Sequence, residues 1–369
     1  MKTKEKIINF IKSEVVLSVA IILAIITCFF VPPDKEYLGY FDYSTLICLF
    51  CMLAVVAGLK STNVFELISR KLIGLFHTRR AVIYALVFGT FFFDMIVAND
   101  MSLITFLPLT YIVLHSTKND KYLAFTFIMQ TIAANMGGMI TPYGNPQNLY
   151  LYSYYNINTT EFFSILLIQS ITVAVLLWIC CAFIHNEPLK LRKNSKIIIS
   201  KKELYIYSIL FILVILSIFR VIPYLITLAI VVLTILIVDR KRFKQIDYAL
   251  IATFFVFFIF SGNIARIPAI KEFISEIVVK NTLLAGIVSC QFISNVPTAI
   301  FLSKFTTNYR ELLISVNIGS LGILISSLAS LITLKEFLKH QPKNFWKYLI
   351  MYTIFNTLFL VVLLLVTTL

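Results

Sequence analysis

Two acids and an amide lie inside one strongly apolar stretch, "FFFDMIVANDMSLITFLPL", residues 91–109. Asp94 and Asp100 are the acids, and Asn99 directly precedes the second of them. A carboxylate at the centre of a membrane costs about 2.5–3.5 kcal/mol on insertion scales, and a bound cation or proton would offset that cost. Asp100 is therefore the predicted coupling residue, whereas Asp94 either shares that role or anchors the local structure.

A second stretch that could perform chemistry is "ANMGGMITPYGNPQNLY", residues 134–150. Its prolines, glycines and amides are incompatible with an uninterrupted helix. Within a membrane, broken backbone is tolerated only inside protein or beside water, where its carbonyls can coordinate a cation and its half-helix N-terminus can face an anion. The alternative is a loop between two short spans, but residues 121–133 are too few to cross a bilayer alone. The sequence therefore predicts a discontinuous helix over 121–155.

The second half of the chain has similar features, "SNVPTAIFLSKF" (294–305) and "NIGSLGILISSLASL" (317–331). Asn99 and Asn295 are both expected at tight turns, where Asn turns the backbone or offers its oxygen to a cation, and these roles are compatible. The stretch 317–331 has glycines and serines but no proline. A mild break and a continuous helix with a small-residue packing face therefore both remain open.

Membrane-spanning helices are the elements that must position these residues. The chain of 369 residues is 59% hydrophobic and 14% charged, whereas about a quarter of the residues of a soluble protein are charged. Apolar runs recur throughout, which predicts an all-α polytopic membrane protein. Two amphipathic stretches, 61–76 and 264–280, suit helices in the membrane interface. The expected spans are 14–31, 41–59, 81–98, 99–115, 121–155, 162–184, 203–219, 221–238, 247–262, 282–303, 311–334 and 348–368.

The basic residues predict how these helices are oriented. We expect a cytoplasmic N-terminus and two re-entrant hairpins, 81–115 and 282–303, that enter from opposite sides. Most Lys and Arg residues then fall in cytoplasmic loops, as membrane topology favours. The net charge of +14 is therefore assigned to topology, and no nucleic-acid partner is expected. The cysteines lie in apolar spans and the histidines in basic loops, so neither set predicts a metal site.

The order of these features divides the chain into two similar units. Each has, in order, a glycine near the end of a span, an amphipathic helix, a hairpin and a discontinuous helix. Because the assigned threading runs them in opposite directions, we expect an inverted repeat. The predicted units are a first repeat, 1–184 (hairpin 81–115, broken helix 121–155), a basic cytoplasmic linker, 185–202, and a second repeat, 203–369 (hairpin 282–303, broken helix 311–334).

At these residues the chain resembles the ion transporter superfamily. That group includes arsenite permeases, citrate–metal transporters, divalent anion/sodium symporters and D-type sodium/proton antiporters. "ANMGGMITPYGNPQN" is similar to the hallmark of its broken helix, and 294–305 and 317–331 resemble the counterparts in the second repeat. The similarity covers most of the chain. It implies two inverted repeats, each with a hairpin and a broken helix, in a homodimer that moves substrate by an elevator-like motion.

The resemblance also implies which residues form the site. The substrate residues would be Asn99, Asn145, Asn295, Thr298, Ser326 and Ser327. The ion-coupling residues would be Asn99, Asp100, Asn135, Gly138, Thr141, Asn295 and Asn317, with Na⁺ at Asn99, Asp100 and Asn295. The corresponding loops also contain Gly137, Gly144 and Gly319.

One departure from the superfamily pattern narrows the resemblance. Divalent anion/sodium symporters have Ser-Asn-Thr at both hairpin tips, where the Thr helps to bind carboxylate. The triplets here are Ala98-Asn99-Asp100 and Ser294-Asn295-Val296, without either threonine. This difference argues against a close dicarboxylate symporter and favours the arsenite-permease and citrate–metal branch.

The predicted function is secondary active transport of a small anion or oxyanion-like solute, coupled to Na⁺ or H⁺, in the inner (plasma) membrane. No enzyme activity and no cofactor beyond the coupling ion are expected. A sodium/proton antiporter of the same fold is an alternative, because Asp100 is buried in apolar sequence and no basic residue lies mid-span to hold an anion. A passive anion channel is another. An intramembrane aspartyl enzyme using Asp94 and Asp100 is the alternative from a different class, although no protease motif surrounds them.

Overall fold

The computed structural model describes residues 14–189, 197 and 199–368, and it consists of α-helices, short 3₁₀ helices and connecting loops. Within these ranges the β-type pairing is a single isolated bridge, between Thr78 and Pro188. This architecture confirms the predicted all-α fold class. The α-helices are α2 (Val15–Phe30), α3 (Tyr43–Ser61), α4 (Val64–Gly74), α5 (Arg79–Asp94), α6 (Asn99–Ser116), α7 (Leu123–Gly137), α8 (Pro146–Tyr154), α9 (Thr159–Ala182), α10 (Lys201–Ile218), α11 (Tyr224–Val238), α12 (Tyr248–Ala265), α13 (Pro268–Lys280), α14 (Thr282–Ile293), α15 (Asn295–Leu302), α16 (Tyr309–Ile318), α17 (Leu328–His340) and α18 (Phe345–Thr368).

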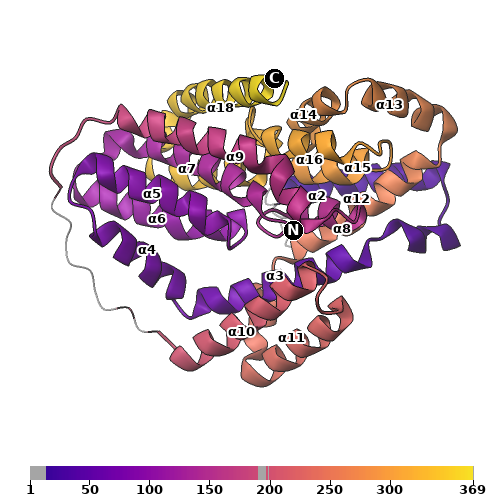
Figure 1. Cartoon of the computed structure of the whole chain (residues 1–369), viewed down its shortest axis with the longest axis horizontal. Helices are drawn as coiled ribbons and strands as arrows, with labels where there is room; N and C mark the ends of the chain where they lie inside the picture. The colour runs from indigo at the N-terminus through magenta and orange to yellow at the C-terminus, as the bar shows by residue number, and fades with distance from the viewer. Residues whose placement is uncertain (1–13, 190–196, 198, 369) are drawn as a thin grey trace, which may run out of the picture.

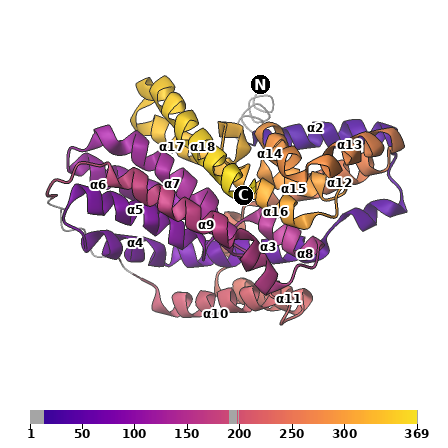
Figure 2. The same cartoon turned by 45° about the horizontal axis from the view of Figure 1, so that its top comes forward.

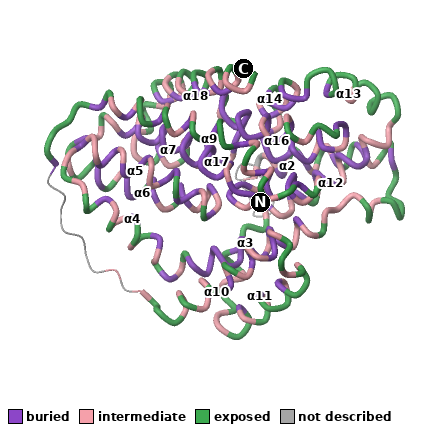
Figure 3. The backbone as a smooth tube through the Cα atoms, in the orientation of Figure 1, coloured by how far each residue is buried: buried purple, intermediate pink, exposed green. Residues whose placement is uncertain are grey.

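Several of these helices are long and apolar enough to cross a membrane. In the described part of the chain there are five such stretches: Tyr43–Ser61, Asp120–Ile140, Thr159–Ala182, Tyr248–Ala265 and Pro342–Thr368. The bent pair α13 and α14, at 117°, makes a sixth if it counts as one span. The outer face of α18 is exposed (Figure 3) and carries large apolar side chains such as Trp346, Ile354 and Leu358. Such a face suits lipid, and the fold is that of a multi-pass membrane protein.

Two helical hairpins have an asparagine at the start of their return arm. In the first hairpin, α5 ends at Asp94 and α6 begins at Asn99. In the second, only Ser294 separates α14 from α15, which begins at Asn295. Ser294 has a φ of 70°, a left-handed conformation that is uncommon for a residue with a side chain and marks a tight turn. Both asparagines therefore lie at hairpin tips.

Two other helices are interrupted. The helical chain of α7 ends at Gly137, continues as one 3₁₀ turn over Gly138–Ile140, and resumes with α8. The chain of α16 ends at Ile318 and resumes with α17, with a 3₁₀ turn at Leu324–Ser326 between them. A continuous helix over 317–331 is thus excluded, and the second break is not mild. Gly322 lies within this break, four residues after the end of α16, and its φ of 113° is a conformation that suits glycine and cannot continue a helix.

The hairpins and broken helices pack in a reciprocal pattern. The arms of the first hairpin pack against α7, and those of the second pack against α16. The half-helices that follow the breaks pack against the opposite half of the chain: α17 packs against α6 and α7, whereas α8 packs against α15 and α16 (Figures 1 and 2). The same exchange relates α2, which packs on α12, to α10, which packs on α3. Each half of the chain therefore completes the helix packing of the other.

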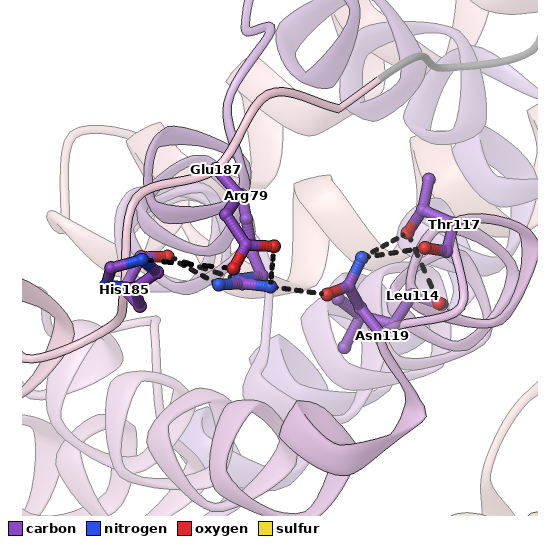
Figure 4. A network of polar contacts seen from close by, with 6 residues as sticks. All are labelled: Arg79, Leu114, Thr117, Asn119, His185 and Glu187. Atoms are coloured by element: carbon purple, nitrogen blue, oxygen red, sulfur yellow. Dashed lines mark hydrogen bonds and ion pairs between the residues drawn. The ribbon is translucent and has the colours of Figure 1, made fainter.

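A polar network fixes the base of the first hairpin (Figure 4). The buried guanidinium of Arg79 donates to the carbonyl of His185, to Asn119 Oδ1 at 3.0 Å and to Glu187 Oε2 at 2.7 Å. Asn119 donates in turn to the carbonyl and hydroxyl oxygens of Thr117. The network therefore joins the start of α5, the end of α6 and the chain beyond α9.

Candidate functional site

The first break ends where proline chemistry allows a helix to begin. Pro146 is the first residue of α8, a position where the missing N–H costs nothing, and Asn145 before it is extended. Gly137 lies so close to α5 that a Cβ there would touch the carbonyl oxygen of Phe91. Thr141 Oγ1 donates to the carbonyl of Met95 at 3.1 Å, in the turn of the first hairpin. The break is therefore held against that hairpin.

The side-chain amide of Asn148 closes the first break from within. Asn148 is fully buried, and its Nδ2 donates to the carbonyl oxygens of Gly138, Met139 and Thr141 at 3.3, 3.0 and 3.3 Å. Carbonyls freed by the end of a helix need partners when water is excluded. One amide in the first turn of α8 thus satisfies three of them.

Two oxygens beside this break lack a side-chain hydrogen-bond donor. Asp94 is 0% exposed; its Oδ1 accepts from Ser102 Oγ at 3.1 Å, whereas its Oδ2 has no side-chain donor among the described residues and faces the backbone of Gly138. Asn145 is 1% exposed; its Nδ2 donates to the carbonyl of Asn135, and its Oδ1 likewise has no donor in the described chain. Buried polar atoms without partners are rare, so each requires an explanation.

Gly138 shows that these two oxygens point at the same small space. A Cβ at this position would touch Asp94 Oδ2 and would lie 2.6 Å from Asn145 Oδ1. Both oxygens therefore approach the Gly138 backbone, and only a residue without a side chain leaves room between them. The space is suited to a small positive charge, either a cation bound by both oxygens or a proton on Asp94.

The ligand types at this point suit particular ions. No group of three or more His, Cys, Asp or Glu side chains that could hold a metal occurs in the described residues. A carboxylate oxygen with an amide oxygen is a hard-oxygen pair, which matches Na⁺ better than transition metals that prefer imidazole or thiolate. The residues therefore fit Na⁺ or H⁺.

The tip of the first hairpin forms a different environment. Asn99 Oδ1 accepts from the backbone N–H of Asp100 at 2.9 Å, so it caps its own turn. Asp100 is partly exposed and lines a cavity of about 290 Å³ that also contacts Lys60, Tyr143 and Asp247. The second acid of the apolar stretch thus faces a cavity shared with a lysine, whereas Asp94 is enclosed in protein.

The tip of the second hairpin contacts the second break. Asn295 Oδ1 accepts from the N–H of Val296 at 2.9 Å and from Ser294 Oγ at 3.3 Å. Ser294 Oγ also donates to the carbonyl of Ser326, in the 3₁₀ turn of the break. Ser326 Oγ donates to the carbonyls of Ser320 and Ile323, both at 2.7 Å. These contacts close the second break on itself.

The two breaks meet in a buried polar cluster. Ser327 Oγ donates to Asn135 Oδ1 at 2.6 Å, and Asn317 Nδ2 donates to Asn148 Oδ1 at 2.7 Å. Gln147 Nε2 donates to Asn317 Oδ1 at 3.4 Å. All these residues are at most 1% exposed. Asn135 Nδ2 and Gln147 Oε1 have no partner among the described residues, so the cluster keeps one free donor and one free acceptor.

The predicted site residues thus fall into several groups. Asn135, Asn145, Gly138 and Thr141 surround the first break, and Asn317 and Ser327 join it to the second. Thr298 Oγ1 donates to the carbonyl of Ser294 within its own helix. No hydrogen bond between Asn99 and Asn295 is found in the described chain. The structure adds residues that the sequence analysis did not select: Ser102, Gln147, Asn148 and Gln291.

The signal for some of these additions was present in the sequence. Gln147 and Asn148 belong to the "GNPQN" run, and their amides lie in the turn that follows the break. Ser102 and Gln291 lie within one or two turns of the tip asparagines. Their roles depend on rotamers and packing, which spacing alone does not provide.

Comparisons with known proteins agree with this architecture. A family model described as citrate transporter matches residues 7–333. An uncharacterized transporter of Methanocaldococcus jannaschii is 34% identical over 299 residues, which cover 80% of this chain and 81% of the relative. The inner membrane protein YbiR of Escherichia coli is 25% identical over 340 residues, or 89% and 88% of the two chains. These findings confirm the resemblance to ion transporter superfamily permeases and indicate a transporter and not an enzyme: the chain belongs to the citrate transporter family.

Proposed function

We propose that this protein is a secondary active transporter that couples uptake or release of a small anion to Na⁺ or H⁺ at Asp94. The observation that carries the proposal is the convergence of Asp94 Oδ2 and Asn145 Oδ1, both buried and without side-chain donors, on the Gly138 backbone. A carboxylate enclosed in this way is costly unless a cation or proton accompanies it. The coupling site is thus assigned to Asp94, and the tip residues Asn99 and Asp100 to the neighbouring access path.

An anionic substrate would bind where the two breaks meet. Asn135 Nδ2 is a free buried donor, and α8 begins nearby at Pro146, so its N-terminal partial positive charge favours an anion. Asn145, Ser326 and Ser327 surround the same region. The buried cluster contains no Lys or Arg, so a co-bound cation at Asp94 would supply the compensating charge. The family description supports an anion of the carboxylate type.

The Asp100 cavity is proposed as the path by which solute reaches the centre. Its lining includes Lys60, Gln245, Asn99 and Pro146. Lys60 attracts anions, whereas Asp100 and Asp247 favour cations. The cavity can therefore admit both partners of a coupled cycle.

We also propose the inverted repeat, a homodimer and elevator-type movement. The reciprocal packing of α8 with α15 and of α17 with α6 supports a two-fold relation between the halves. Gly58 adds a further match, because it approaches Tyr207 of the second half while Gly262 approaches Tyr40 of the first. We propose a cytoplasmic N-terminus, which the basic loops favour, and a location in the inner membrane.

The direct test is transport by the reconstituted full-length chain. Asp94→Asn should reduce Na⁺- or pH-dependent uptake of radiolabelled citrate, arsenite or phosphate in proteoliposomes to the background of empty vesicles. Asp100→Asn should weaken uptake but keep its ion dependence, since that acid lines the path. Ion-dependent uptake that survives Asp94→Asn and disappears in Asp100→Asn would move the coupling site to the hairpin tip.

A sodium/proton antiporter is the second candidate, and one observation favours it. Asp94 is a buried acid without a basic partner in the described chain, which is the type of group that exchanges a proton for Na⁺. In vesicles without any transported anion, a sodium gradient would then drive proton flux. Absence of this flux, together with anion-dependent sodium uptake, would exclude the antiporter.

A further inference from the structure

The amide that satisfies the second break comes from the facing hairpin, whereas in the first break it comes from Asn148 in the half-helix that follows. Gln291, in the first arm of the second hairpin, donates from Nε2 to the carbonyls of Gly319 and Leu321 at 2.9 and 3.0 Å. Its Oε1 accepts from the backbone N–H of Ile323 at 3.0 Å. One amide thus satisfies two carbonyls and one N–H of the interrupted backbone.

The backbone of the second break is shaped around this amide. A Cβ at Gly322 would touch Gln291 Oε1, and the φ of 113° at Gly322 also excludes most side chains. Ser326 Oγ donates to the carbonyl oxygens of Ser320 and Ile323, with which Gln291 makes no hydrogen bond. The carbonyl oxygens of Gly319, Ser320, Leu321, Ile323 and Ser326 therefore already have side-chain donors.

Gln291 and Asp94 have matching places with opposite chemistry. Each lies in the first arm of its hairpin, shortly before the tip asparagine, and each side chain faces a helix break. Asp94 presents an oxygen without a side-chain donor to Gly138, and this buried acid has no basic partner among the described residues, so it requires a proton or a cation. Gln291 presents an NH₂ group, which is itself the electropositive partner.

We propose that the Gln291 amide replaces a cation in the second break, so that the transporter carries one coupling ion per cycle, bound at Asp94. This inference rests on the proposed function and adds its stoichiometry. The NH₂ group of Gln291 contacts the Gly319 and Leu321 oxygens, where a cation would otherwise bind. Unlike an ion, this group is covalently part of the hairpin and does not exchange with solvent. The second break is structural and substrate-facing, and the first break alone responds to the ion gradient.

The test counts cations on the purified full-length chain. Bound ²²Na⁺ and proton uptake are both measured in detergent, on the wild type and on Asp94→Asn. The protons counted are those that the wild type takes up beyond the uptake of the variant. A total of one equivalent per chain is expected, and it should be lost in Asp94→Asn. Two equivalents would overturn the inference but leave the proposed coupling intact. No cation binding at all would overturn the proposed function together with the inference.

A charge substitution tests the role of the amide itself. Gln291→Glu replaces the NH₂ group by an oxygen beside the carbonyls of Gly319 and Leu321, so ²²Na⁺ binding should rise by one equivalent. Gln169→Glu is the matched control, because Gln169 is a buried amide in α9 whose Nε2 donates to Thr367 of α18 and to no carbonyl of either break, and it should leave the count unchanged. An unchanged count in folded Gln291→Glu would contradict the assigned role. If this variant does not fold, the wild-type count decides.

Discussion

The two helix breaks have a similar backbone arrangement but differ in the side chains that contact them. Each interrupts a helix that packs against a hairpin, and each is crossed by polar contacts from the other half of the chain. In the first break Asn148, from the half-helix that follows, satisfies the carbonyls, and the hairpin contributes an acid. In the second break the hairpin contributes Gln291, which satisfies the carbonyls itself. The two breaks thus share a backbone plan and differ in the hairpin side chain that faces each of them, an acid in the first and an amide in the second.

This difference also affects how each break is joined to its hairpin. The second break has three hydrogen bonds to Gln291 and one to Ser294, so we expect it to move with the second hairpin as a unit. The direct side-chain bond from the first break to the turn of its hairpin is that from Thr141 to Met95. An ion at Asp94 would add a further link, which is a physical reason for movement to depend on ion binding.

The largest effect in this comparison is expected for Gly138→Ala. The new methyl group would occupy the space between Asp94 Oδ2 and Asn145 Oδ1, so cation binding and coupled uptake should both fall to background. Gly74→Ala is the control, because a Cβ at Gly74 meets no atom within 4 Å. The measurements are ²²Na⁺ binding, uptake in proteoliposomes and thermal unfolding. A folded Gly138→Ala protein that binds the ion with wild-type affinity would show that the two oxygens do not form the site.

An intermediate effect is expected for Asn148→Ala. The carbonyls of Gly138, Met139 and Thr141 would lose their shared donor, and an unsatisfied buried group costs about 1–3 kcal/mol. The freed oxygens lie beside the proposed ion, so added Na⁺ should restore part of the lost melting temperature. Asn158→Ala, which removes an exposed cap of α9, should show a smaller loss without recovery. Recovery by Na⁺ in both variants would mean that the effect is not specific to the first break.

How far the sequence could predict these differences depends on the type of signal. Proline and glycine in "GGMITPYGNP" predict the first break because their backbone restrictions are local. The second break is larger than the sequence predicts, since it contains a glycine with positive φ whose contact Gln291 comes from another helix. The all-α membrane fold follows from the recurrent apolar runs and the low share of charged residues. The contact of Asp94 with Gly138 did not, because it depends on how α5 packs against α7.

The choice between the two acids shows the same limit. In the sequence, Asp100 has the stronger claim, because it directly follows the tip asparagine. In the structure Asp100 lines a cavity with Lys60, whereas Asp94 is enclosed. Spacing predicted that an acid lies at the site, but only the three-dimensional arrangement separates an enclosed acid from one in a cavity.

The bases of the two hairpins extend the comparison and lead to the smallest predicted effect. At the start of the second hairpin, Asn281 Oδ1 accepts a hydrogen bond from the N–H of Leu284. Glu311 Oε2 accepts one from the N–H of Leu283. The first hairpin is fixed by Arg79, whose guanidinium lowers the pKa of Glu187 below its ordinary value through a hydrogen bond and charge attraction. The stability of the first base should therefore respond to acid through Glu187.

Glu187→Gln tests this expectation by thermal unfolding across pH. A carboxyl group whose pKa is lowered by folding stabilises the fold above its unfolded pKa, about 4.3 for Glu, and this contribution is lost as the pH falls through the folded value. The variant should therefore melt slightly lower than the wild type at neutral pH, and the difference should vanish in acid. The effect is small because Glu187 is half exposed and its pairing is screened by solvent. Glu272→Gln, on the exposed face of α13, should show no such pH-dependent difference. An equal difference at all pH values would mean that Glu187 acts through packing and not through its charge, and the two hairpin bases would then not differ in their response to acid.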